Sequence, residues 1–256
     1  MLTRIESPSL RENRLPALGQ GTYRATVKRI ADLSAEDRRD LVSLYLKYYD
    51  GSTQSQVLRD LDAKTEALLL SFDGILIGFT TLEVYERQWN DSPIRIVYSG
   101  DTVVEREHWG QQTLAFAWIA RMGELKREMP RVPLYWFLIV KGHRTYKFLP
   151  TFGKSFFPHW AIARDDLKPI ADMLATEKFG TDYNPATGIV EFATSHGHLK
   201  QEIALPSIEE MGKESVRFFL ARNPHYLRGC EMVCLCELET HNMRPLTRRI
   251  FSRAAG

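Results

Sequence analysis

Two short apolar runs flank the dipeptide Asp73-Gly74, and this arrangement constrains the fold more than any other feature of the chain. The runs cover residues 67–72 and 75–79. An Asp-Gly pair between apolar runs favours a tight turn, because both turn residues can adopt positive φ angles there. The segment therefore predicts an antiparallel hairpin, and the alternation of Thr80, Leu82 and Val84 carries its second strand to residue 84.

The residues before the hairpin predict one strand and two helices. Apolar and polar residues alternate over 23–30, as in a strand. Ser34 then predicts the N-terminal cap of a helix, with acidic residues in the first turn after it. Apolar and tyrosine residues then recur at helical spacing until residues 50–52 break the helix, and a shorter helix follows over 54–63. Tyr45, Tyr48 and Tyr49 belong either to the core or to the wall of a pocket.

The residues after the hairpin predict a strand, a helix and a second strand. A turn at residues 90–93 leads into a strand over 94–104. A helix then opens at Gly110 and Gln111 and ends before Pro130. The run 134–140 is apolar at every position, as in a strand buried on both faces. An antiparallel meander that continues into a parallel crossover defines a mixed α/β fold.

The last third of the chain predicts a C-terminal α+β extension packed on this core. Helices are expected over 165–179 and 206–221, strands over 188–193 and 229–239, and a basic amphipathic tail over 244–253. We find no internal repeat and no linker that would mark a second independent domain. The predicted organisation is an N-terminal arm (1–22), a core (23–160) and an extension (161–256).

Charge and composition exclude several classes of protein. Lys and Arg number 34 against 32 Asp and Glu, whereas a general nucleic-acid binder is usually far more basic. No signal peptide and no apolar run near 20 residues is present, so we expect a cytoplasmic protein without a transmembrane segment. Cys230, Cys234 and Cys236 lie too close along one strand to bridge and are expected as buried, reduced thiols. His196 and His198 are too few for a metal site, so no metal is expected.

Three segments resemble the GNAT acyltransferase superfamily. Residues 65–83, TEALLLSFDGILIGFTTLE, resemble its second and third strands with their tight turn. Residues 103–114 resemble the strand, loop and helix that hold the donor's pyrophosphate, and residues 143–153 resemble the aromatic segment after the fifth strand. Together with the element order, the resemblance covers residues 23–160. It implies a mixed central sheet of the GNAT type and acyl transfer from a pantetheine thioester.

The resemblance also implies where the acyl donor binds. A loop that enters a helix presents unpaired N–H groups to phosphate oxygens, and the residues at this place are Val103, Val104, Gly110, Gln111, Gln112 and Thr113. The family pattern places a second glycine or alanine where Gln112 stands. Either the pyrophosphate lies differently, or the donor is an acyl carrier protein, which lacks the adenine nucleotide of coenzyme A. Basic residues for such an acidic partner are Arg121, Lys126, Arg127, Arg131, Arg144, Lys147 and Lys154.

Four residues are candidates for proton transfer. His143 and Tyr146 follow the fifth strand, near the place where the resemblance puts the group that protonates the thiolate. Asp101 is a charge inside an apolar strand and is either a base or a bulge residue after Gly100, and Glu83 is a further base candidate. The acceptor would be a small or lipid-like molecule with an amine or hydroxyl, and aromatic residues 148–160 would suit a long acyl chain. The alternative is a non-catalytic GNAT-like module that binds a ligand or a protein.

Overall fold

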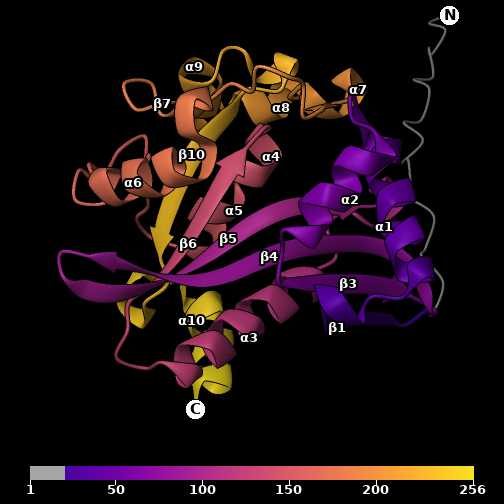
Figure 1. Ribbon diagram of the computed structural model, residues 1–256, viewed down its shortest axis with the longest axis horizontal. Helices are drawn as coiled ribbons and strands as arrows, with labels where there is room; N and C mark the ends of the chain where they lie inside the picture. The colour runs from indigo at the N-terminus through magenta and orange to yellow at the C-terminus, as the bar shows by residue number, and fades with distance from the viewer. Residues whose placement is uncertain (1–20) are drawn as a thin grey trace, which may run out of the picture.

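The computed structural model describes residues 21–256, so most of the predicted N-terminal arm lies outside the described residues. Eight strands form one twisted sheet in the order β1-β3-β4-β5-β6-β10-β8-β7 (Figure 1). They are β1 (Tyr23–Arg29), β3 (Glu66–Phe72), β4 (Ile75–Trp89), β5 (Ser92–Val104), β6 (Leu134–Val140), β7 (Tyr183–Asn184), β8 (Ile189–Val190) and β10 (Glu231–Glu237). A small second sheet joins β2 (Tyr49–Asp50) to β9 (His198–Leu199).

The predicted hairpin is confirmed as β3 and β4. Asp73 and Gly74 form its turn with φ angles of 50° and 85°, the positive values that an Asp-Gly turn supplies. Strand β4 is longer than predicted and runs on to Trp89, where Asn90 and Asp91 form a second turn with positive φ. The meander β3-β4-β5 therefore forms the antiparallel half of the sheet.

Strands β5 and β6 form the parallel pair of the sheet, as predicted. Their pairing runs from Arg95 opposite Leu134 to Ser99 opposite Leu138 and then stops. Strand β5 nevertheless stays paired with β4 as far as Val104. The two parallel strands therefore separate after Ser99, five residues before the end of β5, and leave an opening in the middle of the sheet.

A β-bulge marks the point of separation. The register between β4 and β5 shifts between Thr80 opposite Thr102 and Leu82 opposite Ser99, so that Gly100 and Asp101 together face a single residue of β4. Gly100 is required there, because a Cβ atom on it would lie 2.4 Å from Thr81 Oγ1 and 2.5 Å from Lys64 Cε. Bulges change the direction in which a strand's side chains point. This bulge redirects Asp101.

Helices cover both faces of the sheet. Helix α3 (Thr113–Glu128) packs over Leu70, Val97 and Trp136 together with the C-terminal helix α10 (Pro245–Ala255). The opposite face carries α1 (Ala35–Tyr48), α2 (Gln54–Asp62) and α6 (Lys168–Phe179). Ser34 and Thr53 begin α1 and α2 with complete capping boxes. The remaining helices are short: α4 (His143–Tyr146), α5 (Phe148–Phe152), α7 (Gln201–Ala204), α8 (Ile208–Met211) and α9 (Glu214–Arg222).

The last third of the chain enters the same sheet. Strand β10 pairs antiparallel with β6 from Met232 opposite Val140 to Glu237 opposite Tyr135. The predicted helix over 206–221 is two helices, α8 and α9, with Gly212 and Lys213 between them. The predicted strand over 188–193 is limited to the two residues of β8. Cys230, Cys234 and Cys236 are buried free thiols, as predicted.

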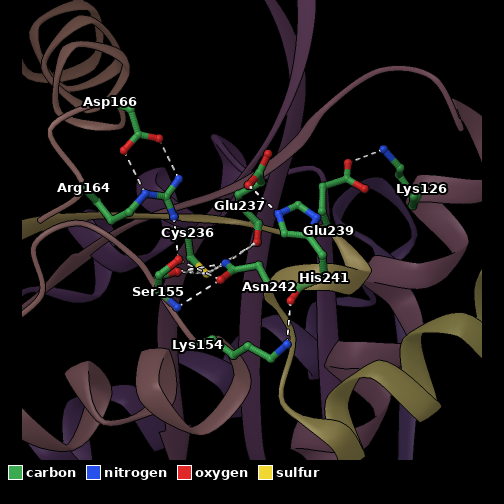
Figure 2. Close-up of polar contacts among 10 residues, drawn as sticks. All are labelled: Lys126, Lys154, Ser155, Arg164, Asp166, Cys236, Glu237, Glu239, His241 and Asn242. Carbon is green, nitrogen blue, oxygen red and sulfur yellow. Dashed lines mark hydrogen bonds and ion pairs between the residues drawn. The ribbon is translucent and has the colours of Figure 1, made fainter. Parts of the chain in front are cut away.

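A buried amide ties the end of β10 to the segment after α5 (Figure 2). Asn242 Nδ2 donates to the carbonyl oxygens of Ser155 (2.9 Å) and Glu237 (3.0 Å), while its Oδ1 accepts from the N–H and the hydroxyl of Ser155. Arg164 Nη1 donates to the same hydroxyl at 2.6 Å and pairs with Asp166. These bonds fix the crossing of two segments that are nearly ninety residues apart in sequence.

Between residues 21 and 256, none of the helices has the length and apolar character that crossing a membrane requires.

Candidate active site

A cavity of about 540 Å³ lies beside the bulge of β5, between α1 and α2 on one side and the end of α6 on the other. We call it the bulge cavity. Tyr45, Asp60, Tyr98, Asp101 and Lys141 are among the residues that line it. Its wall combines tyrosine rings with acidic and basic side chains, so it suits a small polar ligand.

A second cavity of about 470 Å³ lies at the start of α3, and we call it the α3 cavity. Its wall includes Val103 and Val104 at the end of β5, Gly110 before α3, and Phe148 and Phe152 on α5. Most of this lining is apolar, with His108, His143, Arg144 and Lys147 as the basic groups and Glu210 as the acidic one. The cavity therefore offers an apolar channel that ends near positive charge.

The two cavities meet where β5 and β6 separate. Tyr49, Thr102 and Thr145 line both of them. Thr102 follows Asp101 directly in β5, so the bulge places a carboxylate next to this junction. Two ligands that enter from the two cavities would come into contact at the junction, which is the geometry that a two-substrate transfer requires.

Asp101 has the electrostatics of a general base. Protein surrounds its carboxyl, and this burial, together with the neighbouring Asp60 carboxylate, raises the pKa of Asp101 to about 7. Lys64 Nζ donates to Asp60 Oδ1 at 2.7 Å, and although burial alone would raise the pKa of Asp60, the Lys64 ammonium lowers it. Asp60 thus stays ionised while Asp101 titrates near neutral pH.

Two further ion pairs border the bulge cavity. Lys141 directly follows β6, and its ammonium lies 3.3 Å from the carboxylate of Glu231, which opens β10. Lys178 pairs with Glu83 at 2.5 Å and also lies 4.4 Å from the centre of the Tyr98 ring. Glu83 itself does not line the cavity. Its ion pair positions Lys178, so the structure favours a positioning role for Glu83 over that of a base.

The start of α3 has the features expected of a phosphate site. Gly110, Gln111 and Gln112 line the α3 cavity, whereas Thr113 does not. The Thr113 N–H is taken by Gln111 Oε1 at 2.7 Å. Gln112 caps the helix without a side-chain bond, so the first-turn N–H groups of Leu114 and Ala115 have no partner within the helix. They can bind an anion there together with the cationic side chains of the cavity.

His143 lies in the α3 cavity, on the far side of the junction from Asp101. Its side chain is only 2% exposed, and Nε2 is 3.3 Å from Glu210 Oε1. Within the described residues neither ring nitrogen has a partner with hydrogen-bond geometry. Burial lowers the pKa of His143, as does the neighbouring Arg144, so the imidazole is neutral at pH 7. A neutral ring carries one N–H donor, but both ring nitrogens are buried and do not reach the open space of the cavity.

Tyr146 does not lie at the site. Its ring is fully buried among Phe156, Phe218 and Phe219, and its hydroxyl donates to Pro158 O at 2.8 Å. It lines neither cavity. The structure therefore favours a packing role over the proton transfer that we expected, because a one-turn helix turns this side chain into the core.

Some of the basic residues expected to bind an acidic partner form ion pairs within the protein. Arg121 is largely buried and pairs with Glu66 at 2.7 Å, and Lys126 pairs with Glu239. Lys147, by contrast, lines the α3 cavity and forms no ion pair with a residue of the range 21–256. Arg121 and Lys126 are thus held in ion pairs, whereas Arg144 and Lys147 line the α3 cavity.

Several residues of the site were missed in the sequence, namely Asp60, Lys64, Lys141 and Glu231. Lys141 follows an apolar run and Glu231 precedes one. A charged residue that directly borders a buried strand is therefore the sequence feature that could have indicated these two residues. Asp60 and Lys64 lie at the end of a helix with no feature that separates them from ordinary surface residues.

Solved structures with a partial likeness to this chain are described as N-acyltransferases. A probable N-acyltransferase from Enterococcus faecalis V583 is 12% identical (TM-score 0.40) over 61% of this chain and 44% of its own, so the match spans less than half of that protein. An acyl-CoA N-acyltransferase from Pseudomonas aeruginosa is 20% identical (TM-score 0.38) over 51% of this chain and 88% of its own. A GNAT family N-acetyltransferase from Escherichia coli, solved in complex with CoA, is 16% identical (TM-score 0.36), with coverages of 51% and 69%. No protein-family model and no curated protein matches the chain.

Proposed function

We propose that the protein is an acyltransferase that moves an acyl group from a pantetheine thioester to an amine or hydroxyl acceptor. The observation that carries the proposal is the meeting of two cavities at the opening between β5 and β6, with Asp101 beside the junction. One cavity is apolar and ends near a helix N-terminus, while the other is polar and holds a carboxylate that titrates near neutral pH. These are the separate requirements of a thioester and of a nucleophile.

The α3 cavity would bind the donor. A pantetheine arm would lie along its apolar wall, and its phosphate would bind the free N–H groups of α3 and the Lys147 ammonium. The thioester carbonyl would then lie at the junction, near Thr102 and Val103. Both coenzyme A and an acyl carrier protein supply this arm and its first phosphate, so both are candidate donors.

The bulge cavity would bind the acceptor. Asp101 would take a proton from the attacking amine or hydroxyl as the new bond to the carbonyl carbon forms. The tetrahedral intermediate then expels the pantetheine thiolate, which takes up the proton removed from the acceptor and leaves as the thiol. His143 lines the α3 cavity, and a turn of its buried ring toward the donor would let its N–H stabilise the sulfur as negative charge develops.

Thiol release tests this proposal. Purified protein is incubated with acetyl-, octanoyl- and palmitoyl-coenzyme A and with acyl carrier proteins of the same chain lengths, in the presence of a pool of small amines and alcohols. Free thiol is followed with a chromogenic disulfide, and the acylated product is identified by mass spectrometry. Product formation with any donor supports an acyltransferase, and the preferred donor distinguishes coenzyme A from a carrier protein. Donor binding without product under all conditions would instead establish the non-catalytic binding module.

A further inference from the structure

The charges at the bulge cavity are mostly neutralised within the protein. Three ion pairs border it, joining Lys64 to Asp60 at 2.7 Å, Lys141 to Glu231 at 3.3 Å and Lys178 to Glu83 at 2.5 Å. Two charged residues that line the cavity remain, Asp101 and Arg59. Over residues 21–256, neither has an oppositely charged side chain within ion-pair distance.

The two remaining charges differ in sign and in depth. Asp101 lies inside, at the bulge of β5 and next to the junction of the cavities. Arg59 lies on α2, and its exposed position places it at the rim. A ligand that fills the cavity therefore meets a carboxylate at its inner end and a guanidinium at its outer end. Asp101 would gain from a charged partner because it is buried without an ion pair, and the exposed Arg59 guanidinium is free to bind a carboxylate.

We propose that the acceptor is a small amino acid, whose amine contacts Asp101 and whose carboxylate contacts Arg59. This inference rests on the proposed function, because it assigns the nucleophile to the group beside Asp101. A planar guanidinium binds a carboxylate through two parallel hydrogen bonds, which a hydroxyl or an apolar chain cannot form. A simple amine would leave Arg59 without a partner, and a carboxylic acid without an amine would leave Asp101 without one.

The walls of the cavity agree with such a ligand. Tyr45, Tyr98, Phe179 and Phe192 line the same cavity as the two charges and can pack against the carbon skeleton of an amino acid. Its volume of about 540 Å³ is within the range of small-molecule sites. The ion pairs of Lys141 and Lys178 leave these lysines neutralised, so Arg59 is the cation that selects the carboxylate.

The reaction balances with these groups. The ammonium of the amino acid passes one proton to the Asp101 carboxylate, and the neutral amine attacks the thioester carbonyl. The nitrogen–carbon bond forms, the carbon–sulfur bond breaks, and the second nitrogen proton ends on the departing thiol. The products are an N-acyl amino acid, the free thiol and a protonated Asp101, which returns its proton to water.

Kinetics with matched acceptors tests the inference. Thiol release is measured at saturating donor with the proteinogenic amino acids, β-alanine and γ-aminobutyrate, and then with the decarboxylated amine of each active amino acid. We expect kcat/KM for the amino acid to exceed that of its decarboxylated amine by about tenfold or more, as expected for a hydrogen-bonded charge pair. Arg59→Gln should raise the KM for the amino acid by a similar factor and leave kcat and the kinetics of the amine unchanged. Arg39→Gln, an equal charge change on the exposed surface of α1, is the control.

The outcomes separate this inference from the proposed function. If amines react as well as amino acids and Arg59→Gln changes neither, the amino-acid inference is overturned while the acyltransferase stands. If no donor releases thiol, the proposed function fails, and calorimetric titration with the same amino acids decides the ligand class. Binding that Arg59→Gln weakens about tenfold supports an amino-acid site, and the absence of binding overturns it.

Discussion

Replacing Asp101 with asparagine tests whether the Asp101 carboxylate is the general base. Asparagine has nearly the same volume as aspartate, so the bulge at Gly100 and Asp101 and the packing against Thr102 should be kept. The change removes the group that accepts the proton. The loss of a positioned general base lowers turnover by about 10²–10⁴-fold, and we expect a loss in kcat of this size. Affinity for the donor should not change, because Asp101 lines the bulge cavity and not the α3 cavity.

The pH profile gives a second and sharper expectation. Because burial and the Asp60 carboxylate raise the pKa of Asp101 to about 7, only about one tenth of the protein carries ionised Asp101 at pH 6. The parent should therefore lose activity about tenfold per pH unit below pH 7, and Asp101→Asn should lack this acidic limb. Asp60→Asn removes the neighbouring negative charge and frees Lys64 to face Asp101, so the pKa of Asp101 falls and the limb moves to lower pH.

The assay is thiol release between pH 5.5 and 8.5 at saturating donor, with Asp62→Asn as a matched control. Asp62 is also at the end of α2 but is exposed and pairs with Arg38, away from the cavity. Circular dichroism and thermal melting confirm that each variant is folded. An acidic limb that persists unchanged in Asp101→Asn would refute the assignment of the base, and a limb that Asp60→Asn leaves in place would refute the coupling of the two carboxyls.

Four further expectations follow from the structure. Folding raises the pKa of Asp101 from 3.8 to about 7, so the folded protein binds the Asp101 proton more tightly than the unfolded chain does. The stability that protonated Asp101 contributes is therefore greatest below pH 4 and is lost as the pH rises through 7. The melting temperature of Asp101→Asn relative to the parent should therefore rise between pH 5 and pH 8, and a constant difference would contradict this. Gly110→Glu should weaken calorimetric binding of acetyl-coenzyme A by about tenfold more than Gly110→Gln, because both share the strain of a φ of 92° and only one adds a negative charge. Asn242→Ala should lower the free energy of unfolding in urea by about 2–3 kcal/mol, since it leaves buried partners of the amide unpaired, whereas the exposed Asn184→Ala should cost less than about 1 kcal/mol. Tyr146→Phe should cost about 1 kcal/mol of stability for the lost bond to Pro158 and leave turnover at the parental rate, and a hundredfold loss of turnover would return Tyr146 to the site.

The local features of the fold could be predicted because they depend on residues near one another in sequence. The turn at Asp73-Gly74, the cap at Ser34 and the apolar run of β6 each lie within a few residues, and each is present in the structure. The sequence predicts a single helix over 206–221, whereas the structure has α8 and α9 on either side of Gly212. A single glycine is often tolerated inside a helix, so the break at Gly212 depends on tertiary packing that the local sequence does not show.

The site could be predicted only in part. Gly100 before Asp101 indicated a bulge, and the bulge exists, but its consequence depends on Asp60 and Lys64 from a helix forty residues earlier. The ion pair of Lys141 and Glu231 requires two strands that are ninety residues apart to lie side by side. Tyr146 is close to His143 in sequence, but only His143 lines the α3 cavity, because the Tyr146 side chain packs in the core and its hydroxyl donates to Pro158 O.

The position of β10 next to β6 has a consequence for the synthesis of the protein. Strand β6 is complete at Val140, but the strand that covers its free edge ends only at Glu237. At a ribosomal rate of about 5–20 residues per second, this edge stays open for roughly 5–20 s while the intervening chain is made. The edge consists of seven apolar residues, and an uncovered apolar edge is prone to pair with other chains. The nascent chain should therefore need a chaperone such as a ribosome-associated holdase during this interval, and its yield should fall when translation is slowed between codons 141 and 237.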